Sequence, residues 1–360
     1  MHNVVRLNVP FRQTSAAARQ GALVRNFAED RRAREDVFWL KENAEILNVL
    51  ETTGATLGPE ALALHQPGYE QLEARLGFFP QYYRFHLSMC LDLEDLGFGG
   101  DKGARLAEWV AAQGLAEAEL SDLQRAEARR LCLRRGVDPL ASEGAALEAR
   151  LRAFAGRSQT FAMPNKKAAY ELTHIIFYLS EYGRVDPQID AAMHDSLIFA
   201  GTLAFLDFNA DLLAEICIAL RFAGEEPPEV WDIWLRQQLR CFSLVPDEAA
   251  PLADDYHEYL MLNWYLSLTG LGGFADQVPE GRVVFRRVRP LSGPLRELSE
   301  CIYAMGNTRS GDWPKMRETV AARLSQEAQA AIAAAEAATG QFDAFFHGFS
   351  RVGLQMELRA

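Results

Sequence analysis

The chain has 360 residues, of which 49% are hydrophobic and 24% are charged, and its formal net charge at pH 7 is -12. A chain of this size and composition can bury a large core, either in one extended architecture or in two domains. The negative charge argues against general binding to nucleic acid or to an anionic membrane, because both reward a basic surface.

The beginning of the chain and its cysteines predict a cytoplasmic protein. Residues 1–10 are too few and too polar for the apolar region of a signal peptide. No uninterrupted apolar run reaches the roughly 20 residues that cross a bilayer, so we expect no membrane association. The five cysteines are scattered and form no C-x-x-C pair, which predicts a reducing compartment without disulfides or a zinc ribbon.

Hydrophobic periodicity predicts an all-α protein with at most a small two-stranded β element. Val4–Val9 is predicted as one short strand and Arg282–Arg289 as another. The other periodic stretches are predicted as helices, with boundaries good to a few residues. These helices span 28–52, 69–96, 104–115, 119–135, 144–156, 166–182, 188–201, 203–223, 228–243, 254–269, 294–306 and 313–338.

Glycines divide the central helices into pairs. Gly183, Gly224 and Gly270 each follow a long apolar helix, where a left-handed residue ends a helix well. Each interval between them holds two helices, so we predict tandem helical hairpins that form either an α/α toroid or a curved superhelix. Residues 1–60 are interpreted as an arm and a helix packed on the body, and residues 61–360 as a single helical-hairpin domain.

The first candidate motif lies on the helix predicted at 166–182. Glu171, His174 and Tyr178 share one face of that helix, and the other directions are apolar. His174 with Glu171 suits an acid–base pair, and Tyr178 would orient a substrate. The alternative is a core histidine that hydrogen-bonds to Glu171 or to the backbone.

The second motif is an acidic stripe in the helix predicted at 203–223. Asp207, Asp211 and Glu215 follow one another at intervals of four, so their like charges oppose each other on one face. If the stripe is buried, one carboxyl group should keep its proton near neutral pH and serve as a general acid, for which Asp207 and Asp211 are the candidates. Otherwise the stripe faces solvent or pairs with an arginine.

The third motif lies on the helix predicted at 254–269. His257 and Asn263 are polar residues among apolar ones and are candidate substrate ligands. Asp254 precedes His257 by three residues, as Glu171 precedes His174. Such repeated pairs place the ligands of carboxylate-bridged di-iron bundles, so Glu171, His174, Asp254 and His257 are candidate metal ligands. Asp207 or Asp211 and Asp92 or Glu94 would complete that set. The simpler interpretation of Asp254 is a helix-capping acid.

A basic run of four arginines accompanies the second predicted strand, at Arg282, Arg286, Arg287 and Arg289. Guanidinium groups suit an anionic substrate. They also keep an edge strand from aggregating, and that interpretation is the one we favour.

The stretch Glu171-Leu-Thr-His-Ile-Ile-Phe-Tyr-Leu-Ser-Glu-Tyr-Gly183 resembles a segment of bacterial helical proteins known only as domains of unknown function. The chain is most similar to an alphaproteobacterial group of this kind, over most of its length. The resemblance implies a helical fold and implies no activity.

These observations support three hypotheses about function. The first is an enzyme with an internal histidine and carboxylate site in a helical toroid, acting by acid–base chemistry on a small molecule or a cyclisable peptide. The second is an interaction scaffold of helical repeats, in which the polar residues are structural. The third is an oxidase-like bundle with two metal ions. The sequence leaves the cofactor, the substrate and the oligomeric state open.

Overall fold

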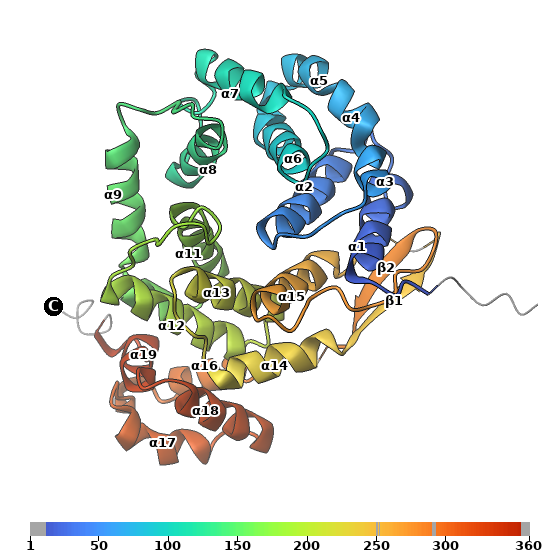
Figure 1. The fold of residues 1–360 in the computed structure, drawn as a ribbon. Helices are drawn as coiled ribbons and strands as arrows, with labels where there is room; N and C mark the ends of the chain where they lie inside the picture. The colour runs from blue at the N-terminus through green and yellow to red at the C-terminus, as the bar shows by residue number, and fades with distance from the viewer. Residues whose placement is uncertain (1–11, 250, 252, 290–292, 354–360) are drawn as a thin grey trace, which may run out of the picture.

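The computed structural model describes residues 12–249, 251, 253–289 and 293–353, and this part of the chain is mostly helical with one small two-stranded sheet (Figure 1). The predicted strand Val4–Val9 lies outside the described residues. Within the described ranges, every helix is too short or too polar to span a membrane.

Six helices follow one another in space as they do along the chain. Each packs on the next, and the last of the six also packs on the first. Figure 1 shows them in the interior of the drawing, with the remaining helices outside them. The six are α2 (Val37–Thr52), α6 (Tyr83–Asp95), α8 (Asp122–Leu133), α11 (Lys166–Leu179), α13 (Ala210–Phe222) and α15 (Tyr256–Leu268).

A second set of helices covers these six on the outside (Figure 1). The longer members are α1 (Ala16–Arg25), α7 (Lys102–Ala112), α9 (Gly144–Ala155), α12 (Ala191–Leu206) and α14 (Glu229–Leu239). The short ones are α3 (Pro59–Leu62), α4 (Gln66–Glu70), α5 (Leu72–Phe78) and α10 (Ser158–Phe161). A π-helical turn, Asn26–Asp30, continues α1 and packs on α2.

The C-terminal helices form a separate group beside α12 and α14, on which α18 packs. In Figure 1 they are the orange and red elements at the bottom. They are α16 (Leu295–Ala304), α17 (Trp313–Ala321), α18 (Gln326–Ala338) and α19 (Phe342–Phe349).

The sheet pairs β1 (Phe242–Pro246) with β2 (Val283–Arg287) in antiparallel register, with Phe242 opposite Arg287. The strand predicted at 282–289 is therefore confirmed. Its partner β1 was missed, because residues 228–243 were predicted as one helix and α14 ends at Leu239.

The prediction of one helix over 203–223 is wrong at its start. Helix α12 continues to Leu206, and Phe208 turns the chain with a φ of 52°. Asn209 then caps α13, because its side chain accepts a hydrogen bond from the Leu212 N–H. Asp207 therefore ends α12 and does not continue the stripe formed by Asp211 and Glu215.

The predicted helices 28–52, 69–96 and 313–338 are each divided by turns into shorter helices. The predicted glycine ends are confirmed for Gly224 and Gly270, which directly follow the C-caps of α13 and α15 and have φ values of 78° and 75°. A left-handed glycine at these places costs little, whereas a side chain would be strained. The end predicted at Gly183 is wrong, because α11 ends at Leu179 and the left-handed residue after its cap is Glu181, with a φ of 49°.

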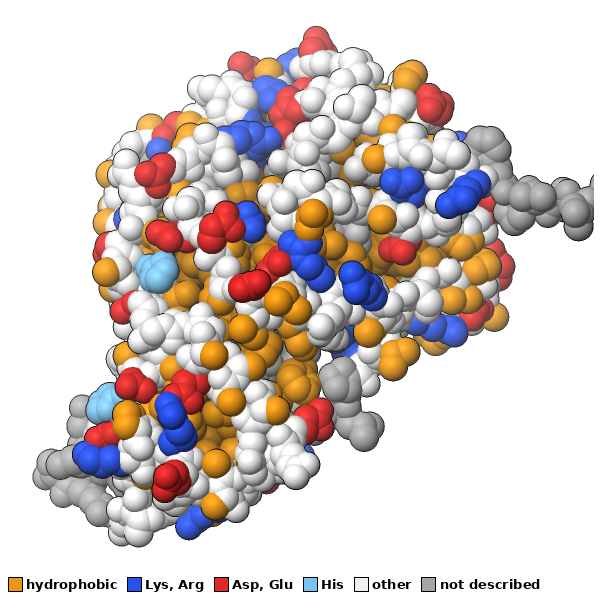
Figure 2. All heavy atoms as spheres, turned by 60° about the horizontal axis from the view of Figure 1, so that its bottom comes forward, with side chains coloured by type: hydrophobic (Ala, Val, Ile, Leu, Met, Phe, Trp, Pro, Cys, Tyr) orange, Lys and Arg blue, Asp and Glu red, His pale blue; other side chains and the backbone are white. Residues whose placement is uncertain are grey.

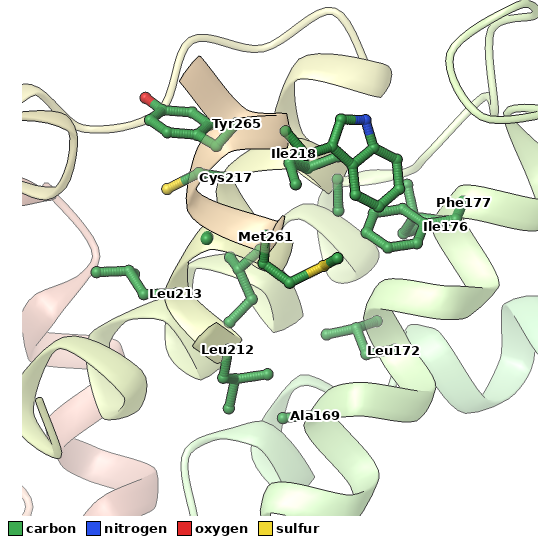
Figure 3. Packing of buried hydrophobic residues seen from close by; sticks show 14 of the residues in the cluster. Ala169, Leu172, Ile176, Phe177, Leu212, Leu213, Cys217, Ile218, Met261 and Tyr265 are labelled. Carbon is green, nitrogen blue, oxygen red and sulfur yellow. The ribbon is translucent and has the colours of Figure 1, made fainter. Parts of the chain in front are cut away.

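Apolar side chains fill the space between α11, α13 and α15. Figure 3 shows Leu172 and Phe177 of α11, Leu213 and Ile218 of α13, and Met261 of α15 in this region. All of these side chains are buried. Charged groups in this part of the molecule therefore need partners, because burying an unpaired charge is costly.

Charge is distributed differently on the surface. Figure 2 shows one face on which acidic and basic side chains alternate around exposed apolar ones, without a broad patch of one sign. This face offers no basic platform for a polyanion, in keeping with the net charge of -12.

Replacing Gly201 by Ala is expected to lower the free energy of unfolding by about 2 kcal/mol, because the added methyl overpacks the core. Gly201 lies inside α12, and a Cβ there would be 2.3 Å from the ring of Trp231, which is fully buried. Denaturant titration of the full chain would measure the loss.

Gly21→Ala is the matched control, since a Cβ at that position of α1 meets only Ala61 Cβ at 3.6 Å. It should leave stability unchanged or raise it by up to about 1 kcal/mol, since alanine favours helix more than glycine does. Equal effects of the two substitutions would contradict the close approach at Gly201.

Candidate functional site

Four ionisable side chains meet where α13 and α15 begin, beside the middle of α2. Asp211 lies in the first turn of α13 and Glu215 one turn later, so both point to the same side of the helix. His257 lies in the first turn of α15, and Glu45 projects from α2. Glu45, Asp211, Glu215 and His257 are called the cluster below.

The imidazole of His257 lies at the centre of the cluster. Its Nε2 is 3.4 Å from Asp211 Oδ1 and 3.8 Å from Glu215 Oε1. Its Nδ1 is 3.6 Å from Glu45 Oε2. These are ion-pair distances, longer than the roughly 2.7–3.2 Å of a good hydrogen bond.

Hydroxyl groups fix the three carboxylates. Tyr170 donates to Asp211 Oδ2 at 2.6 Å, and Thr173 donates to Glu215 Oε2 at 2.6 Å. Tyr256 donates to Glu45 Oε2 at 2.9 Å. As a result, Asp211 Oδ1 and Glu215 Oε1 face His257 Nε2.

His174 lies at the margin of the cluster. Its Nδ1 donates to the Tyr170 carbonyl oxygen at 2.8 Å and is 3.8 Å from Glu215 Oε2. The ring is therefore held by its own helix, beside the Glu215 oxygen that accepts from Thr173.

The electrostatics of the cluster follow from burial and mutual attraction. Burial opposes the charged form of every member. For His257 the three carboxylates outweigh burial, so its pKa lies well above the ordinary value. Burial also opposes ionisation of Glu215 and Glu45, but His257 holds the pKa of each below its ordinary value.

Asp211 behaves differently from the other two acids. Burial raises the pKa of Asp211, and the charge of Glu215 adds to that effect, although His257 and the Tyr170 hydroxyl act against both. Two carboxylates one helical turn apart therefore differ in their affinity for a proton, as in many acid–base pairs.

A cleft of about 660 Å³ opens onto the cluster. Asp211, His257 and Tyr170 form its inner end, and the His257 side chain is 37% exposed. Its outer wall carries both acidic and basic groups. These include Lys166, Asp207, Asp255, Glu258, Arg287, Arg289 and Arg296.

The arginines of the cleft wall are paired with acids. Arg287 Nη2 is 2.9 Å from Glu258 Oε1, and Arg289 contacts Asp255 and Glu258. The proposed anion-binding role of the basic run is thus weakened, because these charges are already balanced. The edge-strand role fits better for Arg286, which is half-exposed and pairs with Asp247.

Of the predicted site residues, Asp211 and His257 belong to the cluster. Asp207 forms an ion pair of 2.7 Å with Lys166 on the cleft wall. Glu171 makes none of the cluster's contacts. Tyr178 is buried, with its ring 6.0 Å from that of His174 and outside the cleft lining.

Two further predicted residues have structural partners. Asn263 is fully buried, donates to the Tyr259 carbonyl at 2.8 Å and accepts from the Phe274 N–H at 2.6 Å. These bonds hold the loop after α15. They engage both the nitrogen and the oxygen of the amide, and Asn263 is not among the residues that line the cleft.

Asp254 accepts two hydrogen bonds from Arg31 at 2.9 and 3.0 Å and one from the Phe285 N–H at 2.9 Å. Its side chain is 3% exposed. Asp254 therefore anchors β2, and the predicted metal set that combined it with Glu171, His174 and His257 is not brought together.

The remaining acids of the predicted di-metal set are also engaged elsewhere. Asp92 is fully buried and pairs with Arg134 at 2.7 Å. Glu94 accepts from Tyr69 and pairs with Arg135. Within the described part of the chain, the one group of three or more side chains arranged to hold a metal ion is Asp211, Glu215 and His257.

Sequence reasoning missed Glu45 and the hydroxyls of Tyr170, Thr173 and Tyr256. Glu45 had a signal, because Glu42, Asn43 and Glu45 are polar residues between apolar segments of the same helix. Polar groups that are buried need partners. Lys41, one turn earlier, is a local partner of Glu45, but His257 and Tyr256 are more than 200 positions away and no local pattern identifies them.

Residues 1–352 match a family described as a domain of unknown function, DUF6902. Comparison with curated proteins and comparison with solved structures gave no match. The family match spans nearly the whole sequence and agrees with the resemblance of the segment around His174 to helical proteins without a known function. The chain belongs to the DUF6902 family.

Proposed function

We propose that this protein is an enzyme and that its active site is the cluster of Glu45, Asp211, Glu215 and His257 at the inner end of the cleft. One observation carries the proposal: the imidazole of His257 lies among three carboxylates and is open to a cleft on one side. Asp211 and Glu215 repel each other in this arrangement, and groups that are kept at a cost in stability are typical of functional sites.

The arrangement suits acid–base chemistry on a small molecule. His257 reaches the cleft with one edge of its ring, and Asp211 lies beside it with a raised pKa. A proton donor and a proton acceptor thus face the same space. Tyr170, held by Asp211, lies within reach of the same substrate.

We also propose that the six inner helices form a closed α/α toroid. The contact of α15 with α2, after the unbroken series from α2 to α15, supports closure rather than an open superhelix. In a closed ring, residues 37–52 belong to the toroid itself, because α2 is one of the six inner helices and carries Glu45.

Asp211→Asn tests the enzyme proposal against a structural role. The substitution keeps the shape of the side chain and removes one of two repelling charges, so stability should be unchanged within about 1 kcal/mol or should rise. Turnover should fall by about 10²–10⁴-fold, since a positioned acid–base group contributes that much. Panels of chromogenic esters, phosphate esters, glycosides and amides would identify a substrate.

Asp92→Asn is the matched control. Asp92 is a fully buried acid that pairs with Arg134 and lies outside the cluster. Its substitution should cost about 3 kcal/mol, because it leaves a buried guanidinium short of a partner. If Asp211→Asn destabilises the protein as much as Asp92→Asn, the cluster is a structural network. That result would favour the hypothesis of an interaction scaffold over that of an enzyme.

A further inference from the structure

We infer that His257, Asp211 and Glu215 bind one divalent metal ion at the inner end of the cleft. The inference rests on the active site proposed above and names its cofactor. The three residues offer one nitrogen and two carboxylate oxygens within 4.8 Å of one another. This set differs from the di-metal set expected from the sequence, since Glu171, Asp254 and His174 take no part in it.

The distances within the set suit a shared ion better than direct hydrogen bonds. His257 Nε2 is 3.4 Å from Asp211 Oδ1 and 3.8 Å from Glu215 Oε1. Two ligands that are each about 2.1 Å from one tetrahedral ion lie about 3.4 Å apart. All three ligand atoms lie within 4.8 Å of one another, so the two carboxylates would have to move toward the ion to complete the coordination.

Each ligand is oriented by a second group, as metal ligands usually are. Tyr170 holds the far oxygen of Asp211, and Thr173 holds the far oxygen of Glu215. Glu45 Oε2 faces His257 Nδ1 at 3.6 Å, which would keep Nε2 free of a proton for the ion.

A buried oxygen that accepts no hydrogen bond points to the same ligand. Asp211 Oδ1 is inaccessible to solvent, has no hydrogen-bond partner among the described residues, and has His257 Nε2 beside it at 3.4 Å. Buried carboxylate oxygens are rarely left unpaired, and a cation between Asp211 and His257 would satisfy this one.

The charge and the shape of the site indicate which ion and which coordination to expect. Three carboxylates surround one imidazole, and the Lys41 ammonium lies 3.5 Å from Glu45 Oε1, so a doubly charged ion would balance the remaining negative charge with His257 neutral. Three protein ligands and one side open to the cleft match a catalytic rather than a structural ion, with a position left for water or substrate. One imidazole with two carboxylates suits Zn²⁺ or Mn²⁺.

The test uses the full chain, stripped of metal with a chelator and then titrated with Zn²⁺ or Mn²⁺ by calorimetry. We expect one ion per chain, release of a proton on binding and a higher melting temperature at saturation. His257→Gln and Asp211→Asn should each lower the affinity at least 100-fold. Tyr170→Phe, which keeps all three ligands, should lower it about 10-fold.

Asp195→Asn is the matched control, because Asp195 forms a distant pair with His194 at 4.0 Å outside the cleft. It should leave the affinity unchanged. Absence of saturable binding, or binding that Asp211→Asn and His257→Gln leave intact, would overturn the inference.

The metal inference and the enzyme proposal fail separately. If no ion binds but Asp211→Asn abolishes turnover, the metal inference is overturned and the metal-free acid–base site stands. If one ion binds through the three residues, the inference holds even where no substrate of the panel is turned over.

Discussion

Replacing Arg31 by Met is expected to lower the free energy of unfolding by about 3–5 kcal/mol, which is the usual cost of removing one partner from a buried ion pair. The Arg31 side chain is fully buried. Its Nε donates to Glu42 at 3.0 Å, its Nη1 and Nη2 donate to Asp254, and Nη1 also donates to the Val283 carbonyl at 2.8 Å. Methionine keeps the stem and leaves Asp254 as an uncompensated buried charge.

The loss should extend to the cluster, because Arg31 connects the elements that position it. Asp254 binds both Arg31 and the Phe285 N–H of β2, and His257 follows three residues later. Glu42, the other partner of Arg31, lies on α2 one turn before Glu45. We therefore expect Arg31→Met to weaken ligand binding in the cleft as well as stability.

Urea titration of the full chain would measure the effect, with Arg25→Met as the control. Arg25 forms an exposed pair with Glu29, and such pairs contribute less than about 1 kcal/mol. The double variant Arg31→Met with Asp254→Asn should cost less than the sum of the two single changes, since the second removes the orphaned charge. A loss below about 1 kcal/mol for Arg31→Met would contradict a structural role for this network.

What the sequence predicted well depends on neighbours along the chain. The helical class, the glycine ends at Gly224 and Gly270, and the strand near Val283 all follow from local periodicity and backbone freedom. Asp211 and His257 could also be chosen as candidate site residues from the sequence, because charged side chains are unusual in an apolar helix.

What the sequence did not predict depends on distant partners or on one backbone angle. Asp207 fits the i, i+4 spacing with Asp211, yet the left-handed Phe208 separates them onto different helices. Asp254 fits the spacing of a metal-ligand pair, yet it forms a buried ion pair with Arg31, which lies 223 positions earlier in the chain. A spacing rule holds only while the helix is unbroken and no buried counter-charge competes.

Acidification should destabilise the protein through two buried neutral histidines. Burial, with the charge of Arg34, lowers the pKa of His65 to about 4, and burial with the charge of Arg75 lowers the pKa of His86 to about 4. Asn43 donates through its amide to Phe27 and Trp39, so its oxygen accepts from His65 Nε2–H at 2.8 Å. His65 Nδ1 is buried and has no hydrogen-bond partner among the described residues, so a proton there would be unpaired and the neutral ring is favoured in the folded protein.

The sign follows from proton binding in the two states. The unfolded chain takes up a proton at each histidine near its ordinary pKa of about 6.5, whereas the folded chain resists until about pH 4. The stabilising contribution is therefore complete above pH 6.5 and disappears as the pH falls to 4. Each histidine accounts for about 3 kcal/mol of that loss, at 1.36 kcal/mol per pKa unit.

His65→Gln and His86→Gln should each flatten the dependence of stability on pH between 6.5 and 4. Glutamine cannot take up a proton in this range, and at position 65 its amide can still donate to Asn43. Urea titrations at several pH values would give the slope of unfolding free energy against pH for each variant and for the unmodified chain. The carboxylates contribute equally to both slopes, so their contribution cancels in the difference. His194→Gln is the control and should leave the slope unchanged, because the His194 side chain is 32% exposed and is not buried as the other two imidazoles are. An unaltered slope in both buried variants would contradict the prediction, because it would mean that these imidazoles take up their protons in the folded chain as readily as in the unfolded chain.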